Sequence, residues 1–246
     1  SRGVHLPGIQ KSPDLELVAV CDLKPERMEY ARNTYGIRED HCFADYHDLI
    51  ACPDVDVIDI STSNNAHFEV AKAAIEAGKP FCLEKPVTLT AEEADILAKA
   101  AQEKGIPNMV CFSYRFKAAA RYAKELVEKG MLGDIYHVYM QYLQGGGGPS
   151  YDLPRSWRYQ KELTGTGALG DLGCHALDLV SFVTGKNYRK AVGHTDTYEV
   201  QIKGEEEIPD FPADGHVAGT YSEREVYRLT SEISRTIQIQ MWYPRT

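Results

Sequence analysis

The chain has 246 residues, of which 43% are hydrophobic and 26% charged, and its formal net charge at pH 7 is -9. A chain of this length and composition can bury a full core, so we expect a globular protein of one large domain or two moderate ones. The acidic balance and the scattered lysines and arginines argue against a nucleic-acid partner, which normally requires a basic stripe.

Local patterns disfavour two further classes of protein. No uninterrupted apolar run approaches the roughly 20 residues that a membrane helix needs, and no charged-then-apolar leader opens the chain. We therefore expect a cytoplasmic protein without a membrane partner. The cysteines are widely spaced and form no CxxC pair, which predicts reduced thiols and no metal site. They are Cys21, Cys42, Cys52, Cys82, Cys111 and Cys174.

The first half of the chain alternates predicted strands and helices. The opening residues SRGVHLPGIQ predict a helix, and because neither a strand nor a methionine precedes it, we expect a trimmed N-terminus. Such alternation predicts a parallel sheet with helices on both faces, in which ligands bind beyond the carboxyl ends of the strands. The predicted strands are 15–22, 54–62, 80–84 and 107–113, and the predicted helices are 24–36, 65–79 and 90–105.

The pattern changes after Ser113. Residues 118–133 have the periodicity of an amphipathic helix, and residues 134–144 alternate as a half-exposed antiparallel strand does. Further strands are predicted over 199–211 and 235–243. We therefore divide the chain into two domains, residues 1–114 and 115–246.

A glycine motif in the second half is expected to be a false match. Residues 165–170 read GTGALG, which fits the GxGxxG pattern letter for letter. The dinucleotide fingerprint requires a preceding strand and an acidic residue about 20 positions further on. The preceding segment RYQKELT is charged rather than strand-like. We therefore do not assign these glycines to a phosphate loop.

Asp22, at the end of the first predicted strand, is a candidate for adenosine recognition. A carboxylate there can accept both hydrogen bonds from a ribose diol and repel a 2′-phosphate, which favours NAD over NADP. The alternative is that Asp22 merely caps the helix that starts near Pro25. The residue taken by itself supports both interpretations equally.

Five segments, in order, resemble the Gfo/Idh/MocA oxidoreductases. They are VAVCD, STSNNAHFEVAKAAIEAGKPFCLEKP, SYRF, WR and GDLGCHALD, within residues 1–185. The resemblance implies an α/β fold: a Rossmann-type parallel sheet domain that binds NAD(P), followed by an α+β domain with an open, largely antiparallel sheet. It also implies that residues 2–10 are the first helix after a glycine-rich loop. The chain departs from the family at both ends, since that loop is absent and the segment after residue 186 matches poorly.

Lys85 is the first candidate catalytic residue. An ammonium at the carboxyl end of a parallel strand can stabilise the negative charge that develops on a carbinol oxygen during hydride transfer. Pro86 fixes the backbone after it, and the resemblance implies a cis bond there. Glu84 is expected to pair with nearby donors or with the nicotinamide region. The alternative is a solvated lysine before a helix that Thr90 and Glu93 cap.

His175 and Asp171 are candidates for the proton transfer. Their spacing of four places them on one face of a helix. A histidine titrates near neutral pH and can accept the hydroxyl proton, while a carboxylate can orient it or the substrate. The alternative for His175 is a satisfied core histidine. We expect a structural role for Asp178, one turn further on.

The remaining candidates follow from the resemblance. Thr62, Asn64 and His67 match the nucleotide-contacting turn, although the asparagine is also an ordinary helix cap. Substrate contacts are expected from Arg115 and from the Trp157-Arg158 pair, with surface arginines as the alternative.

Taken together, these residues predict an NAD(P)-dependent oxidoreductase that acts on CH-OH groups of a sugar, polyol or related small carbohydrate. NAD is the expected cofactor, and a homodimer or homotetramer is the expected assembly. Two alternatives remain open: an NAD-dependent glycoside hydrolase of similar fold, and a non-catalytic NAD-binding regulator. Intact Lys85, Asp171 and His175 argue against the regulator.

Overall fold

A computed structural model describes residues 3–143, 157, 160–191, 193, 198–199 and 230–231 of the chain. The chain forms two compact units, Ser1–Cys111 and Phe112–Thr246. The sequence-based division lies after residue 114, within η3 (Ser113–Phe116).

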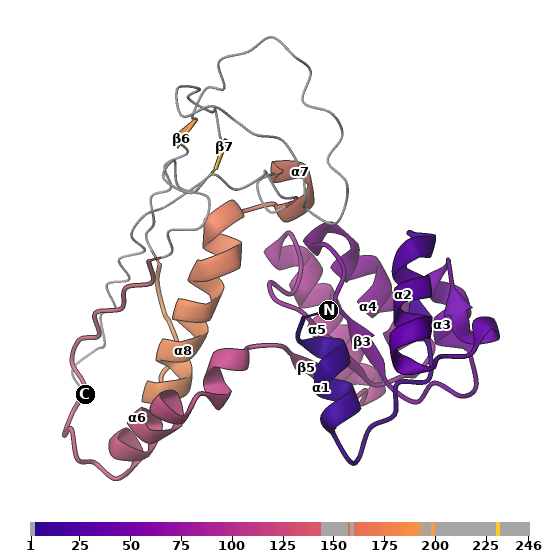
Figure 1. The fold of residues 1–246 in the computed structure, drawn as a ribbon. Coiled ribbons are helices and arrows are strands. Elements are labelled where there is room, and N and C mark those ends of the chain that lie inside the picture. The colour runs from indigo at the N-terminus through magenta and orange to yellow at the C-terminus, as the bar shows by residue number, and fades with distance from the viewer. Residues whose placement is uncertain are drawn as a thin grey trace, which may run out of the picture. The chain divides into compact units, whose positions relative to one another are not determined.

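The first unit alternates short parallel strands with helices (Figure 1). Its strands are β1 (Val20–Cys21), β2 (Cys42–Phe43), β3 (Ile58–Ile60), β4 (Phe81–Leu83) and β5 (Asn108–Val110). Its helices are α1 (His5–Lys11), α2 (Pro25–Tyr35), α3 (Tyr46–Ala51), α4 (His67–Glu76) and α5 (Ala91–Lys104), with short 3-10 turns η1 (Glu39–His41) and η2 (Asn64–Ala66).

The strands form two separate parallel sheets. One contains β1 and β2, and the other has the order β3-β4-β5. In the larger sheet Asp59 lies beside Cys82, and Ile60 lies beside Leu83. The predicted parallel sheet is therefore confirmed, although the strands are shorter than their apolar runs.

One face of the larger sheet is covered by α4 and α5. Because side chains alternate along a strand, Ile58 and Ile60 of β3 share a face with Phe81 and Leu83 of β4, and all four are buried. They pack against aliphatic residues of the two helices, which are Val70, Ala71, Ala74 and Ile75 of α4 and Leu97 and Ala101 of α5. Asp59 and Cys82 consequently point to the opposite face.

The boundaries of α5 follow the signals in the sequence. The Thr90 side chain accepts a hydrogen bond from the Glu93 backbone N–H, and the Glu93 carboxylate accepts one from the Thr90 N–H, so the predicted capping box is confirmed. The helix ends at Gly105, whose φ of 62° lies in the left-handed region that glycine adopts without strain. The Thr90-Glu93 capping box thus fixes the start of α5, the helix that follows the Glu84-Lys85-Pro86 turn.

The second unit is mainly helical where the structure describes it. Helices α6 and α8 pack side by side, and η3 contacts both. The elements are η3, α6 (Ala118–Glu128), α7 (Lys161–Thr164), the π-helical turn η5 (Leu169–Gly173), α8 (Cys174–Thr184), and an antiparallel pair of two-residue strands, β6 (Tyr198–Glu199) and β7 (Thr230–Ser231).

The prediction of a strand over 134–144 is wrong for its described part, because the backbone of residues 134–143 forms no strand ladder with another described segment. Alternating hydrophobicity gives a segment a strand-like face, but a strand also needs a hydrogen-bonding neighbour. Of the predicted strand 199–211 only Glu199, in β6, is described, and 235–243 lies outside the described residues. The glycines of 165–170 follow helix α7 rather than a strand, which agrees with their rejection as a phosphate loop.

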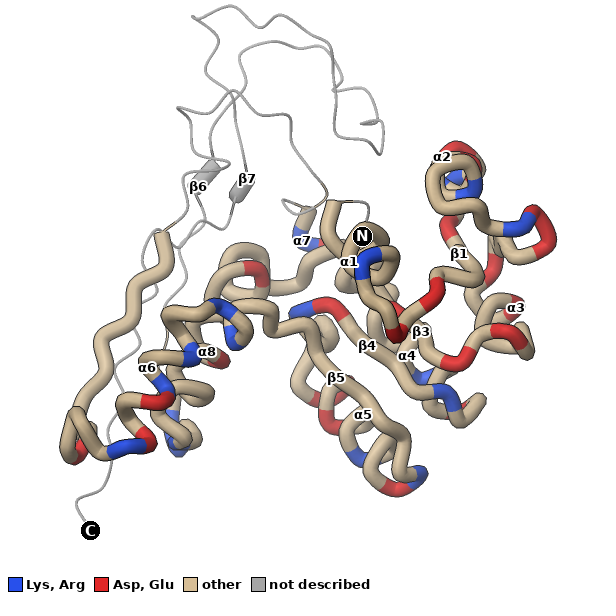
Figure 2. The backbone as a smooth tube through the Cα atoms, turned by 60° about the horizontal axis from the view of Figure 1, so that its bottom comes forward, with Lys and Arg blue, Asp and Glu red and all other residues tan. Residues whose placement is uncertain are grey.

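Charged residues of both signs are interspersed along α2, α4, α5 and α6 (Figure 2). On α6, for example, Lys124 pairs with Glu128 four residues later at 2.8 Å. No helix in the described residues combines the length and the hydropathy of a membrane span.

Candidate active site

Asp22 directly follows β1, and its backbone N–H donates to Phe43 O at 3.3 Å, which extends the pairing with β2. Its carboxylate accepts the Lys24 N–H at 3.0 Å and pairs with Arg27 at 3.3 Å. The Asp22 side chain remains 31% exposed. Asp22 thus contacts the Lys24 N–H just before α2 and the Arg27 side chain, but within the described residues it caps no backbone N–H of the helix, and it is still open to solvent.

Glu84 follows β4 and is held from two sides. Its backbone N–H donates to Ile60 O at 2.9 Å. One carboxylate oxygen accepts the Lys85 N–H at 3.0 Å, and the other is 2.9 Å from His5 Nε2. Burial by itself would raise the pKa of Glu84, but the hydrogen bond and charge of His5 together with the backbone N–H and charge of Lys85 outweigh it, so the pKa is lowered. Glu84 is therefore an ionised carboxylate with two donors.

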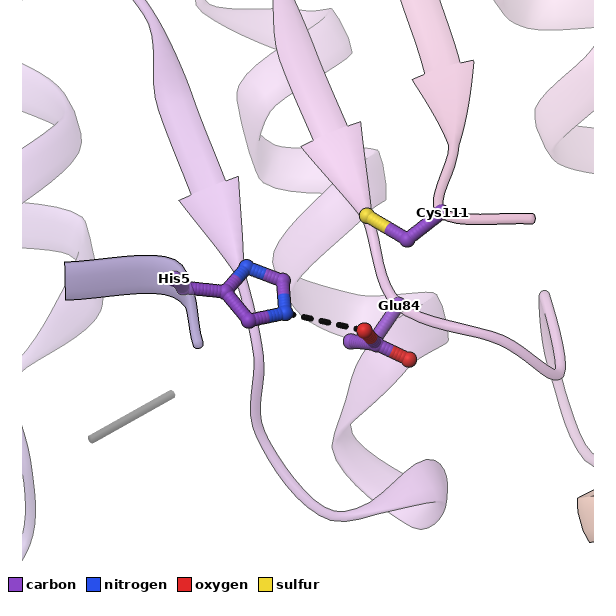
Figure 3. A group of neighbouring side chains, drawn as sticks. All are labelled: His5, Glu84 and Cys111. Carbon is purple, nitrogen blue, oxygen red and sulfur yellow. Dashed lines mark hydrogen bonds and ion pairs between the residues drawn. The ribbon is translucent and has the colours of Figure 1, made fainter. Parts of the chain in front are cut away.

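His5, in the first turn of α1, joins Glu84 to Asp59 of β3 (Figure 3 shows the contact with Glu84). Its Nδ1 lies 3.0 Å from Asp59 Oδ2. Hydrogen bonds to Asp59 and then to Glu84 raise the pKa of His5 to about 9. At neutral pH the ring is an imidazolium that donates to both carboxylates. This trio was not predicted from the sequence, although an acidic residue inside the apolar run DVIDIST signals a buried partner.

The Lys85-Pro86 peptide is cis, as the resemblance implies. Directly behind it, His67 of α4 is fully buried and its Nδ1 lies 2.7 Å from Pro86 O. Burial lowers the pKa of His67, so the ring is neutral, and the short distance assigns its proton to Nδ1. Its Nε2 is 3.4 Å from Thr62 O. His67 thus holds the turn after β4 by a hydrogen bond and lies against the turn after β3 without one, because a ring protonated at Nδ1 has no Nε2 proton to donate to Thr62 O.

The two other residues of the predicted nucleotide-contacting turn differ in exposure. Thr62 is exposed, and its hydroxyl donates to Ser63 O at 3.3 Å. Asn64 is buried at the start of η2. Lys85 is half-buried at the end of β4. The first unit therefore brings Thr62, Glu84 and Lys85 to the carboxyl end of the larger sheet, as its parallel topology requires.

In the second unit His175 lies in the first turn of α8 and is buried. Its ring stacks on Tyr114 of η3, with 4.3 Å between ring centroids and 14° between planes. Phe112 meets it edge-on at 6.2 Å. These two aromatic rings fix the plane of the imidazole. The sequence predicted a catalytic role for His175 but not its contacts with Tyr114 and Phe112.

Asp171 lies in the π-helical turn that leads into α8. Such turns are rare and are concentrated at functional sites. Tyr142 forms a short hydrogen bond with Tyr114, and burial, that hydrogen bond and the charge of Asp171 raise the pKa of Tyr142. Asp171, His175 and two tyrosines therefore belong to one neighbourhood, of which sequence reasoning missed Tyr142.

Arg115 forms a two-point ion pair with Asp178 of α8, one bond being 2.8 Å. The Asp178 side chain is only 8% exposed, which agrees with its expected structural role. Arg115 therefore holds η3 to α8. Trp157 is half-buried and its carbonyl accepts the Gln160 N–H at 3.0 Å, whereas Arg158 lies outside the described residues.

The strand-end residues fit a dinucleotide. Among the described residues each Asp22 oxygen has one donor, and a carboxylate oxygen can accept two hydrogen bonds, so on this count both retain capacity for a ribose diol. Arg27, 47% exposed, places a cation beside them. An arginine in this place is also what a 2′-phosphate would use.

Comparison with protein families assigns both units to the same family. Residues 2–112 match the model described as "Oxidoreductase family, NAD-binding Rossmann fold", and residues 120–222 match the "GFO/IDH/MocA C-terminal domain". The chain belongs to the Gfo/Idh/MocA family. The predicted fold class, a Rossmann-type sheet followed by the C-terminal domain of this family, is thereby confirmed.

Two curated members of the Gfo/Idh/MocA family illustrate the likeness. Levoglucosan dehydrogenase of Pseudarthrobacter phenanthrenivorans is 36% identical over 167 residues, which are 68% of this chain and 42% of that protein. Inositol 2-dehydrogenase of Salmonella typhimurium is 34% identical over 143 residues, 58% of this chain and 42% of that protein. The chain thus spans less than half the length of these relatives.

Solved structures of similar proteins agree with this assignment. An oxidoreductase domain protein from Kribbella flavida matches with a TM-score of 0.67 and 31% identity, over 80% of this chain and 52% of that one. A levoglucosan dehydrogenase in complex with NADH and levoglucosan matches with a TM-score of 0.60 and 32% identity, over 80% of this chain and 50% of that one.

Proposed function

We propose that the protein is an NAD(P)-dependent oxidoreductase that transfers a hydride between a nicotinamide cofactor and a CH-OH carbon of a sugar, polyol or related small carbohydrate. The observation that carries the proposal is the Glu84-Lys85-Pro86 turn at the carboxyl end of β4, fixed by His5 on one side and His67 on the other. Similarity to levoglucosan and inositol dehydrogenases supports the substrate class.

The topology of the first unit supports a dinucleotide-binding sheet. In the order 3-2-1-4-5-6, strand 1 lies between strand 2 and strand 4. The sheets β1-β2 and β3-β4-β5 match five of these six strands: β1 and β2 correspond to strands 2 and 3, and β3, β4 and β5 to strands 4, 5 and 6. We infer that a strand preceding α1 in the full-length protein joins them, and that the turn after it meets the pyrophosphate.

NAD is the preferred cofactor in this proposal. Asp22 accepts the ribose hydroxyls, and its charge opposes a 2′-phosphate. Thr62 and Asn64 line the nucleotide side, while His67 acts through the Pro86 carbonyl to which its Nδ1–H donates. When bound, NAD supplies the nicotinamide carbon that accepts a hydride.

Each catalytic role belongs to a residue whose chemistry suits it. The Lys85 ammonium stabilises the developing negative charge on the substrate oxygen. His175 accepts the hydroxyl proton when its imidazole is neutral. Asp171 favours the imidazolium that results, and Tyr114 holds the ring plane by stacking. Trp157 and Arg158 contact the sugar, whereas Arg115 acts by holding η3 to α8.

The lysine role predicts a kinetic effect confined to turnover. In the full-length protein, Lys85→Ala should lower kcat by on the order of 100-fold to 1,000-fold and change NAD affinity by no more than about threefold, because the lost contact forms mainly in the transition state. The measurement is NADH formation with a panel of polyols and sugars. A kcat within a few-fold of the wild type would make Lys85 structural.

Two comparisons sharpen this test. Lys99→Ala is the matched control, since Lys99 is a 72% exposed lysine of the same unit that pairs with Asp95 on the surface of α5. It should leave kcat within about twofold. Release of a sugar from glycosides without accumulation of NADH would replace the proposal by the NAD-dependent glycoside hydrolase.

We also propose a cytoplasmic homodimer or homotetramer. All six cysteines are free thiols, as a reducing compartment favours. Large apolar side chains are exposed along 131–143, namely Met131, Leu132, Tyr136, Tyr139 and Leu143, and could be covered in an assembly. Sedimentation equilibrium of the full-length protein tests this, and a monomer at micromolar concentration would contradict it.

A further inference from the structure

Ligating side chains from four elements gather on the face of the larger sheet that α4 and α5 do not cover. Asp59 of β3 and Cys82 of β4 are register partners on this face. Glu84 lies two residues beyond Cys82, and Cys111 follows β5 with its N–H bonded to Leu83 O at 2.8 Å. His5 approaches them from α1.

The distances within this group suit one small cation. The Sγ atoms of Cys82 and Cys111 are 3.2 Å apart. One oxygen of Asp59 and these two sulfurs all lie within 4.8 Å of one another, and so do donor atoms of His5, Glu84 and Cys111. Figure 3 shows His5 reaching toward Glu84 and the Cys111 sulfur lying on the same side of the strands.

Charge and access also favour a cation. The carboxylates of Asp59 and Glu84 both contact His5 and lie beside the two thiols. The Asp59 side chain is 24% exposed and that of Glu84 28% exposed, so the group can be reached from solvent. A divalent ion would balance the charge that two thiolates add.

We propose that Asp59, Cys82 and Cys111 bind a thiophilic divalent cation, such as Zn²⁺, with water as the fourth ligand. Two sulfur ligands disfavour Mg²⁺ and Ca²⁺, which prefer oxygen, and suit Zn²⁺. A tetrahedral site with Zn–S bonds of about 2.3 Å separates two sulfurs by about 3.8 Å, so the thiols need to move apart by only about half an ångström. His5 orients the Asp59 carboxylate by hydrogen bonding, as second-layer partners of zinc ligands do.

Proton balance is part of the proposal. Each thiol gives its proton to solvent as its sulfur bonds the metal, so binding releases two protons and changes no oxidation state. Two thiols this close could instead be oxidised to a disulfide. The neighbouring carboxylates oppose the free thiolate that starts such a reaction, whereas they attract a metal ion.

The test uses the reduced, metal-free, full-length protein. Titration with Cd²⁺ should produce a thiolate-to-metal charge-transfer absorbance that saturates at one ion per chain, and Zn²⁺ should displace it. Cys82→Ser and Cys111→Ser should each weaken Cd²⁺ binding by at least about 100-fold, and His5→Gln by about tenfold, as loss of a second-layer partner does. Circular dichroism and thermal melting of each variant establish that it folds.

Cys42→Ser and Cys174→Ser are the matched controls, because both remove a half-buried thiol outside the group. They should leave Cd²⁺ binding unchanged. The proposal is overturned by the absence of charge-transfer absorbance in the wild type, or by full binding in folded Cys82→Ser or Cys111→Ser protein. It is equally overturned if the isolated protein carries a Cys82-Cys111 disulfide that mass spectrometry detects as the loss of two hydrogens. NADH formation is measured separately, so failure here does not bear on the proposed oxidoreductase activity.

Discussion

Between β3-β4 and helices α4-α5 the first unit buries a continuous aliphatic cluster, whereas the described part of the second unit joins its elements by an ion pair and stacked rings. The buried hydrophobic residues of α8 are only Ala176 and Val180. In dense aliphatic packing, a change in the volume of any side chain disturbs its neighbours on every side. Directional contacts fix particular side chains and leave others free. We expect the two regions to respond differently to the same substitution.

The largest difference should appear with two matched valines. Val70 of α4 is 6% exposed and Val180 of α8 is 5% exposed. Val70→Ala should destabilise the protein by about 2–3 kcal/mol, since the surrounding cluster cannot collapse into the cavity, and Val180→Ala by about 1 kcal/mol. Urea denaturation, monitored by circular dichroism, gives both losses of unfolding free energy. Hydrogen exchange of α4 and α8 peptides shows in which unit each loss occurs. Equal losses would remove the contrast between the units.

The ion pair of the second unit offers the next test. Arg115→Ala leaves the buried Asp178 carboxylate without the guanidinium and should destabilise the protein by about 2 kcal/mol. Arg115→Lys should recover only part of this, since an ammonium cannot make the two-point contact. Removing Lys99, which pairs with Asp95 on the surface, should cost less than about 0.5 kcal/mol.

Thermal melting and urea denaturation of these three variants provide the measurement. If Arg115→Ala is as mild as the loss of Lys99, the Arg115-Asp178 pair does not hold η3 to α8, and a substrate contact for Arg115 becomes the better interpretation.

A smaller effect is expected at Asp22, where a side chain at the end of β1 sets cofactor choice. Asp22→Ser removes the charge that opposes a 2′-phosphate and leaves Arg27 available to bind one. NADP affinity relative to NAD should rise by about tenfold. Adding Arg27→Ala should cancel the gain. Titration of both cofactors, in which wild-type protein binds NAD more tightly, checks the prediction; equal or tighter NADP binding by the wild type would contradict it.

Local patterns predicted much of the first unit. Helical periodicity gave α2, α4 and α5, and the Thr90-Glu93 spacing gave the start of α5 because both halves of a capping box lie within four residues. Neither β2 nor α3 was predicted, since residues 42–51 are too short to show either the strand or the helix period clearly.

Contacts between distant residues could not be read in this way. His5 is 54 positions from Asp59 and 79 from Glu84, so nothing local links the three. The same holds for Cys82 and Cys111, whose spacing matches no metal-ligand motif. The catalytic candidates were found through the family resemblance, whereas the stacking of Tyr114 on His175 required the structure.

The pH dependence of hydride transfer in the full-length protein tests the central claim most directly. Single-turnover rates of polyol oxidation are needed, because NADH release could otherwise hide the chemical step. A base must be neutral to accept a proton, so the wild-type rate should rise with pH as the His175 imidazole loses its proton. His175→Gln should flatten this rise while NAD binding persists, and Asp171→Asn should move it to lower pH, because loss of the carboxylate lowers the proton affinity of the imidazole. An unchanged pH profile in His175→Gln would contradict the account and make Tyr114 or Lys85 the next candidate for the proton acceptor.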